Sequence, residues 1–291
     1  MGWFLVGAAY LTTAMYVDAA MWYPAGDEDE TTGDGFWERG ETLLFEQPAR
    51  IDAGVAAVAD SVAGAPEMYF LGFAGYGEGR VFAEEIKLAA QVVGQRFATV
   101  ARELLLVNDR RDLDSLPLAT TASLGYALRG LANRMDVEED ILFLALSSHG
   151  SEGTLAVLNG PLMLQELSDE ALAEALGASG IRWRVIVISA CHAGSFVDAL
   201  KNPDTIIITA AAADRTSFGC SDERDLTYFG EAFYRDALPG AETLRAAFEI
   251  ADEAISRREA AEAKRASDPQ AYFGEALERH LDENFGAPHP E

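Results

Sequence analysis

Two stretches of the chain determine the fold: DILFLALSSHG at residues 140–150 and WRVIVISACHAGSF at residues 183–196. Each begins with an uninterrupted apolar run, which is typical of a strand buried on both faces of a parallel sheet that is covered by helices. Each run ends at small residues, and a side chain that can take part in catalysis follows: His149 in the first stretch and Cys191 in the second. The pattern predicts an α/β fold with a site at the ends of these strands.

Ligands of open α/β sheets bind at the carboxyl ends of the strands, so two adjacent parallel strands would bring this imidazole and this thiol to one edge. The thiolate is the nucleophilic form of cysteine, and a nearby imidazole and a helix N-terminus stabilise it. Ala193, Gly194 and Ser195 fit a tight turn into such a helix, with backbone N–H groups facing the site. The N–H groups of Gly150 and Cys191 are candidates for an oxyanion hole.

The alternative is a purely structural role for both residues. A single Cys is most often a small buried apolar residue, and a single His is more often structural than a base. The chain, however, contains only two Cys and four His, and one of each follows the two most strand-like runs. This coincidence favours the catalytic interpretation.

The motifs HGSEG at residues 149–153 and SACHAGSF at residues 189–196 resemble the legumain (C13) peptidase family of the caspase-like clan, its bacterial-type members above all. Residues 209–231, TAAAADRTSFGCSDERDLTYFGE, are similar to the segment after the nucleophile in legumains and in the catalytic subunit of glycosylphosphatidylinositol transamidase. The resemblance covers roughly residues 68–238. It implies a caspase-like three-layer sandwich, with a mainly parallel central sheet flanked by helices, and cysteine endopeptidase activity.

The resemblance also implies a pocket for the residue before the scissile bond. Its members correspond to Arg80 in GFAGYGEGR, Ser217 in DRTSF and Glu231 in TYFGE, while Ser189 stands where the family has an acidic residue. A pocket of mixed charge suits the amide of Asn. Because a guanidinium binds a carboxylate through two hydrogen bonds, Arg80 with fewer acids around it shifts the expected preference toward Asp.

The implied mechanism uses Cys191 as the nucleophile and His149 to form the thiolate or to protonate the leaving amine, with Glu78 in the place of a family Asn that orients the imidazole. No metal or organic cofactor is required. Two alternatives remain open at this point: a transpeptidase, in which an amine replaces water, and a catalytically idle membrane-tethered scaffold. A metacaspase preference for basic residues would need an acidic pocket, and Arg80 argues against it.

The charge of the chain restricts its partners. It has 291 residues, with 22 Lys and Arg against 48 Asp and Glu, and a formal net charge of −26. Such a surface repels phosphate backbones, so we expect a peptide or protein substrate and no nucleic acid. Two Cys cannot form a disulfide framework, and no CxxC or HxxxH spacing predicts a structural zinc site. The oligomeric state is left open.

Composition also predicts the division of the chain. Residues 1–23 are apolar with one charge, Asp18, which favours association with a membrane. Residues 24–47 form an acidic linker, residues 48–285 the peptidase domain, and residues 286–291 a frayed C-terminus. Because no Lys or Arg flanks the first segment, the side of the membrane on which the domain lies is not predicted.

Within the domain, strand and helix patterns alternate, which predicts right-handed crossovers and a parallel sheet. The helix after the HGSEG motif begins at Ser168, with Asp169 and Glu170 in its first turn. Strands are predicted over residues 68–73, 103–108, 141–147, 183–189 and 205–209, short extended segments over 154–158 and 162–164, and further helices over 51–62, 81–97, 120–134, 227–237 and 242–265.

Overall fold

The computed structural model describes residues 33–160, 162, 164–220 and 224–285. The chain divides into two compact units, Met1–Arg39 and Gly40–Glu291, and every contact reported below lies within the second. The helices are α1 (Gly33–Ala57), α2 (Arg80–Phe97), α3 (Thr121–Ala132), α4 (Asp169–Ser179), the 3-10 helix η2 (Ala193–Phe196), α5 (Val197–Leu200), α6 (Tyr228–Gly230), the π-helix η3 (Glu231–Ala237), α7 (Leu244–Ala261) and α8 (Glu275–Phe285). The strands are β1 (Met68–Ala74), β2 (Glu103–Val107), β3 (Ile141–Ser147), β4 (Gly150–Ser151), β5 (Thr154–Leu155), β6 (Leu167–Ser168), β7 (Trp183–Ser189), β8 (Thr205–Thr209) and β9 (Gln270–Phe273).

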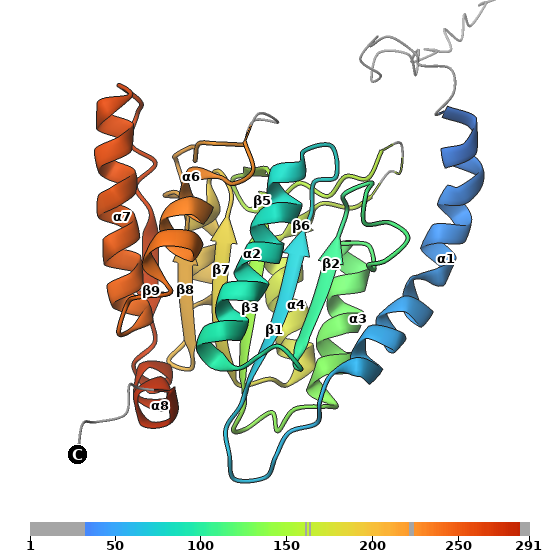
Figure 1. Ribbon diagram of the computed structural model, residues 1–291, viewed down its shortest axis with the longest axis horizontal. Helices are drawn as coiled ribbons and strands as arrows, with labels where there is room; N and C mark the ends of the chain where they lie inside the picture. The colour runs from blue at the N-terminus through green and yellow to red at the C-terminus, as the bar shows by residue number, and fades with distance from the viewer. Residues whose placement is uncertain (1–32, 161, 163, 221–223, 286–291) are drawn as a thin grey trace, which may run out of the picture. The chain divides into compact units, whose positions relative to one another are not determined.

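The central sheet has the strand order β2-β1-β3-β7-β8-β9 (Figure 1). Its first five strands are parallel, and β9 runs antiparallel to β8 at one edge. Every residue of β1 and β3 is buried, as expected for strands covered on both faces. The five strands predicted from their apolar runs and their parallel arrangement are confirmed.

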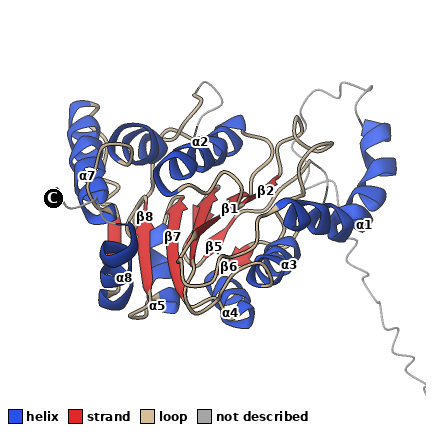
Figure 2. Ribbon diagram, turned by 60° about the horizontal axis from the view of Figure 1, so that its bottom comes forward, coloured by secondary structure: helices blue, strands red, loops and turns tan. Residues whose placement is uncertain are grey.

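Helices cover both faces of the sheet, as Figure 2 shows with the strands lying between two layers of helices. Side chains alternate along each strand, so that Phe70 and Phe143 belong to the core beneath α2, η3 and α7. Their neighbours Tyr69 and Leu142 belong to the second core, beneath α3 and α4. The predicted three-layer α/β architecture is therefore confirmed.

The helix that precedes the strand of Cys191 begins as the sequence predicts. The Ser168 hydroxyl accepts a hydrogen bond from the N–H of Ala171 at 3.1 Å, which satisfies one of the free donors of the first turn of α4. Asp169 and Glu170 follow in that turn, where negative charge is favourable. This cap fixes where α4 starts and thus how the chain returns to β7.

Three segments differ from the sequence-based prediction. The first helix begins at Gly33 instead of residue 51, so the second part of the predicted linker is helical. Its Gln47 is buried, and the side-chain oxygen accepts from the N–H of Leu118 at 2.6 Å, so a tertiary contact holds this polar segment as helix. The strands β6 and β9 were not predicted, because each is only two to four residues long and is defined by its neighbour in the sheet.

Two predicted segments, residues 1–23 and 286–291, lie outside the described residues. Among the helices that the structure describes, none is both long enough and apolar enough to cross a bilayer.

Candidate active site

The strands β3 and β7 end at the same level of the sheet. They are adjacent and parallel, with Ser147 opposite Ser189 in the register. The N–H of Ser148 donates to the carbonyl of Ser189 at 3.2 Å, which continues the pairing for one more residue. His149 and Cys191 each follow two residues after the paired serines, so the structure brings both to one edge of the sheet (Figure 1).

The backbone of Gly150 packs directly against that of Cys191. A Cβ added at Gly150 would overlap the carbonyl oxygen of Cys191 and would lie 3.0 Å from the Cβ of Ala190. Only a residue without a side chain allows this approach of two backbones. The two segments after β3 and β7 are therefore in contact at the positions that precede the first turn after each strand.

The sulfur of Cys191 has a specific polar neighbour. The N–H of Ser217 donates to Sγ at 3.3 Å, and the carbonyl oxygen of Ser217 lies 3.7 Å from the same sulfur. A donor aimed at sulfur stabilises negative charge on it. Ser217 itself is 8% exposed, so its segment is fixed beside the thiol.

The second thiol, Cys220, has a different environment. Burial, and then the negative charges that Cys191 and Glu85 can carry, raise the pKa of Cys220 to about 12. A thiol of this kind stays protonated at neutral pH and is a poor nucleophile. Of the two cysteines, Cys191 is the one with a donor at its sulfur.

The ring of His149 is held between two aromatic rings. It packs edge to face against Tyr76, with ring centroids 4.6 Å apart, and against Phe82 of α2 at 4.9 Å. Phe82 is fully buried. These contacts restrict the imidazole to one orientation at the end of β3.

The turn after Cys191 differs from the expectation in one respect. His192 has a positive φ of 58° and places its Nδ1 2.9 Å from the carbonyl oxygen of Ala213, so it is a loop residue as predicted. The N–H of Gly194 donates to Ala211 at 2.8 Å, and that of Ser195 to His192 at 3.0 Å. These N–H groups are used inside the turn and do not face the site.

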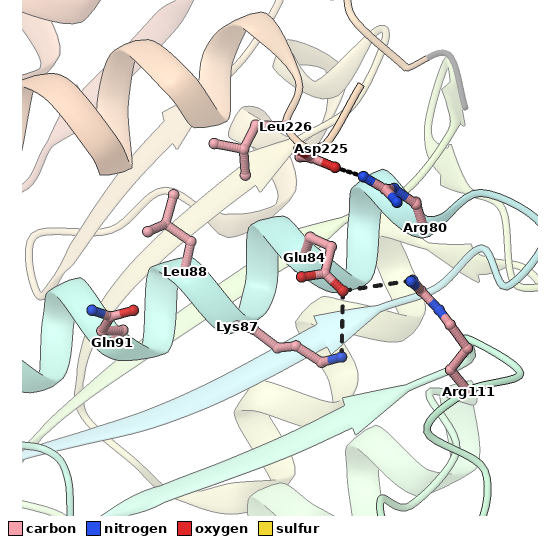
Figure 3. Close-up of a pocket in the computed structure, with 8 residues that line it drawn as sticks. All are labelled: Arg80, Glu84, Lys87, Leu88, Gln91, Arg111, Asp225 and Leu226. Atoms are coloured by element: carbon pink, nitrogen blue, oxygen red, sulfur yellow. Dashed lines mark ion pairs between the residues drawn. The ribbon is translucent and has the colours of Figure 1, made fainter. Parts of the chain in front are cut away.

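Arg80 is the first residue of α2, and its half-exposed guanidinium forms an ion pair with Asp225. Both side chains line a surface pocket of about 520 Å³ along α2 (Figure 3). Among the residues described, neither His149 nor Cys191 lines this pocket. In this structure, the predicted specificity arginine thus has a carboxylate partner within the chain.

Glu231 does not have the environment of a free pocket residue. Its carboxylate contacts the guanidinium groups of Arg224 at 2.5 Å, Arg258 at 2.5 Å and Arg235 at 2.9 Å. Burial opposes ionisation, but these three charges prevail and hold the pKa of Glu231 below its ordinary value. Glu231 is the centre of an arginine cluster that joins η3 to α7.

Glu78, predicted to orient the imidazole, has two partners of its own. Its Oε1 accepts from the guanidinium of Arg110 at 3.0 Å and from the N–H of Gly160 at 3.0 Å. These bonds tie the loop after β1 to two later loops. The proposed contact between Glu78 and His149 stays a prediction.

A buried carboxyl group that the sequence analysis did not single out lies beside Ser189. Glu85 of α2 is fully buried, and its two oxygens contact Ser147 and Thr227. The hydroxyl of Ser189 lies 3.2 Å from that of Thr227. The signal in the sequence was a Glu inside the apolar face of a helix, between Phe82 and Ile86.

Comparison with known proteins identifies the relatives of this chain. Residues 130–278, just over half of the chain, match the model of the Peptidase C13 family. Legumain from Canavalia ensiformis is 26% identical over 160 residues, which are 51% of this chain and 33% of legumain. The chain thus matches only about a third of the length of that relative.

The fold has a solved counterpart as well. The crystal structure of caspase-1 from Spodoptera frugiperda superimposes with a TM-score of 0.50 and 12% identity, over 75% of this chain and 94% of the caspase. At this identity the likeness concerns the fold alone. From the family match and the fold together, this chain belongs to the Peptidase C13 family, a legumain-like family of cysteine peptidases in the caspase-like clan.

Proposed function

We propose that the protein is an endopeptidase that cleaves peptide bonds with Cys191 as nucleophile and His149 as its acid and base. The observation that carries this proposal is the meeting of the β3 and β7 ends, with the Ser217 N–H donating to the Cys191 sulfur at 3.3 Å. A donor at sulfur favours the thiolate, which is the form that attacks a carbonyl carbon.

In the proposed reaction, Sγ of Cys191 bonds to the carbonyl carbon while the N–H groups of Gly150 and Cys191 bind the oxygen that becomes negative. The C–N bond then breaks, and His149 gives its proton to the leaving amine. Water attacks the resulting thioester, His149 takes up the proton of that water, and the thiolate leaves. The close contact of the Gly150 and Cys191 backbones supports their pairing in one oxyanion hole.

We further propose a preference for Asp before the scissile bond, with Asn as the weaker substrate. The support is the Arg80 and Asp225 ion pair, since Arg80 already binds a carboxylate of the kind that an Asp substrate would present. Such a substrate would displace Asp225. Ser189 and Ser217 remain the neutral members of the proposed pocket, and the arginine cluster around Glu231 makes that residue a support for the pocket wall.

The test uses the full chain and fluorogenic peptides that differ only in the residue before the cleaved bond. Cleavage after Asp or Asn that is lost in Cys191→Ala and in His149→Ala, and retained in the matched thiol control Cys220→Ala, is the expected result. Equal cleavage by wild type and Cys191→Ala would contradict the proposal. Wild-type protein that cleaves nothing and whose Cys191 is alkylated no faster than Cys220 would favour an idle scaffold.

Specificity has its own pair of variants. Arg80→Gln is expected to lower kcat/KM for the Asp peptide by about 100-fold, as expected for a lost charged hydrogen-bond pair, and to spare the Asn peptide. Asp225→Asn is expected to raise kcat/KM for the Asp peptide, because the competing carboxylate is gone. A transpeptidase would instead show a new ligated product when an amine is added, at the expense of hydrolysis.

A further inference from the structure

The buried carboxyl group of Glu85 lies where three elements of the site meet. It extends from the buried face of α2, and its Oε1 accepts from the hydroxyl of Ser147 at 3.0 Å, at the last residue of β3. Its Oε2 accepts from the N–H of Thr227 at 3.2 Å and from the hydroxyl of Thr227 at 2.5 Å. Thr227 is the N-cap of α6 and in turn accepts from the N–H of Gly230 at 2.8 Å.

The third element is β7. The hydroxyl of Ser189, its last residue, lies 3.2 Å from that of Thr227 and is 2% exposed. Ser147 and Ser189 face each other in the register, two residues before His149 and Cys191 respectively. One carboxyl group therefore reaches the ends of both strands that carry the proposed catalytic residues.

The space around this group is filled. A Cβ at Gly230 would overlap the Glu85 carboxylate, so α6 approaches it as closely as a helix can. The groups that act on the carboxyl are neutral hydroxyl and backbone donors, and burial raises the pKa of Glu85. Its titratable neighbours are Cys220, whose pKa it helps to raise, and the buried Tyr234 of η3, whose pKa is raised by burial and then by Glu85.

We infer that Glu85 is a positioning residue of the proposed reaction, whose buried carboxyl group fixes the ends of β3 and β7, and with them His149 and Cys191, against the N-terminus of α6. This inference rests on the proposed function. Glu85 touches no substrate and acts through Ser147, Ser189 and Thr227.

The chemistry of the contacts predicts which replacements succeed. In Glu85→Gln, the amide oxygen can accept from the N–H and hydroxyl of Thr227, and the amide nitrogen can donate to Ser147, whose hydroxyl then acts as acceptor. In Glu85→Leu, all of these buried groups lose their partner. The matched control is Glu249→Leu, the same change at an exposed position of α7.

The experiment measures the rate at which iodoacetamide alkylates Cys191 between pH 5 and pH 9, by mass spectrometry of the Cys191 peptide, in the full chain. It also measures kcat and KM for the best fluorogenic peptide and the cooperativity of thermal unfolding. Alkylation depends only on the state of the thiol, so it reports on Cys191 even if no peptide is cleaved. Failure of the proposed function and failure of this inference are thereby distinguished.

We expect Glu85→Leu to lower kcat by about tenfold or more with KM nearly unchanged, and to move the pH at which Cys191 alkylation is half-maximal, because misplaced groups lose rate before they lose binding. Glu85→Gln should restore both within about threefold, since it keeps the hydrogen bonds, and Glu249→Leu should match wild type. A cooperatively folded Glu85→Leu with a wild-type alkylation profile and kcat would overturn the inference. So would a Glu85→Gln as impaired as Glu85→Leu.

If Glu85→Leu does not fold, Ser147→Ala decides, because it removes only the contact to β3. Alkylation and kcat reduced by about threefold or more would support the inference, as expected for one lost hydrogen bond. Values equal to wild type in a folded Ser147→Ala would overturn it.

Discussion

Replacing Gly150 by alanine tests whether the contact between the two strand ends forms the oxyanion hole. The new Cβ would overlap the backbone oxygen of Cys191, closer than the 3.0 Å below which real Cβ atoms essentially never lie. Because the obstructing atom belongs to the backbone and not to a flexible side chain, the peptide of Cys191 must move by several tenths of an ångström. That peptide adjoins both the nucleophile and one proposed donor.

The size of the effect follows from the loss of alignment. A displacement on the order of 1 Å at a reacting group costs about 100-fold in rate, and loss of one oxyanion donor costs about 10² to 10³ in kcat. We therefore expect kcat of Gly150→Ala to fall by roughly 100-fold or more, with a much smaller change in KM, because the donors act on the transition state.

The assay compares kcat and KM of wild type, Gly150→Ala and Gly177→Ala with the same fluorogenic peptide. Gly177 is an exposed helical residue of α4 with nothing within 4 Å of an added Cβ, so it controls for the substitution itself and should gain about 0.4–1 kcal/mol of stability. A cooperatively folded Gly150→Ala with kcat within about twofold of wild type would refute the reasoning, since ~0.4 kcal/mol is less than any donor loss.

Three further predictions concern the surroundings of the site. Gly230→Ala should destabilise the fold by about 1–3 kcal/mol in urea unfolding, because its Cβ overlaps the buried Glu85 carboxylate; unchanged stability would contradict the packing. The lowered pKa of Glu231 stabilises the fold above the ordinary carboxyl pKa of about 4.3 and ceases to do so as the pH falls through the folded-state value. Glu231→Gln should therefore lower Tm by roughly 2–4 °C at pH 7, about 1 kcal/mol, with the difference closing near pH 3, and a difference that grows on acidification would reverse the assignment. In Cys191→Ala, the raised pKa of Cys220, about 12, leaves about one thiol in ten thousand ionised at pH 8, so iodoacetamide should label it far more slowly than a free cysteine.

The sheet was predictable because its strands are continuous apolar runs, and the register that pairs Ser147 with Ser189 follows from placing those runs side by side. The strand β9 was not, because Gln270–Phe273 is half-buried at the sheet edge and owes its extended form to β8. The helix α1 likewise depends on a distant contact, that of Gln47 with Leu118.

The positions of His149 and Cys191 came from the strand ends and could be deduced from local sequence. Their environment could not, because it depends on contacts between distant parts of the chain. Glu85 reaches Thr227 across 142 positions, and Arg258 lies 27 positions from Glu231. A pattern along the chain shows that Glu85 is unusual on an apolar helix face, but only the folded structure shows which groups it meets.

The strand order has a consequence for how the protein is made. The first three long strands to leave the ribosome, β2, β1 and β3, are neighbours in the sheet, and β7, β8 and β9 are then added one after another at the β3 side. Until β7 is synthesised, the fully apolar β3 is an open edge, and open apolar edges are where nascent chains associate wrongly. A ribosome that pauses between β6 and β7 would therefore hold the imidazole on a half-built, aggregation-prone sheet, with the thiol still to come.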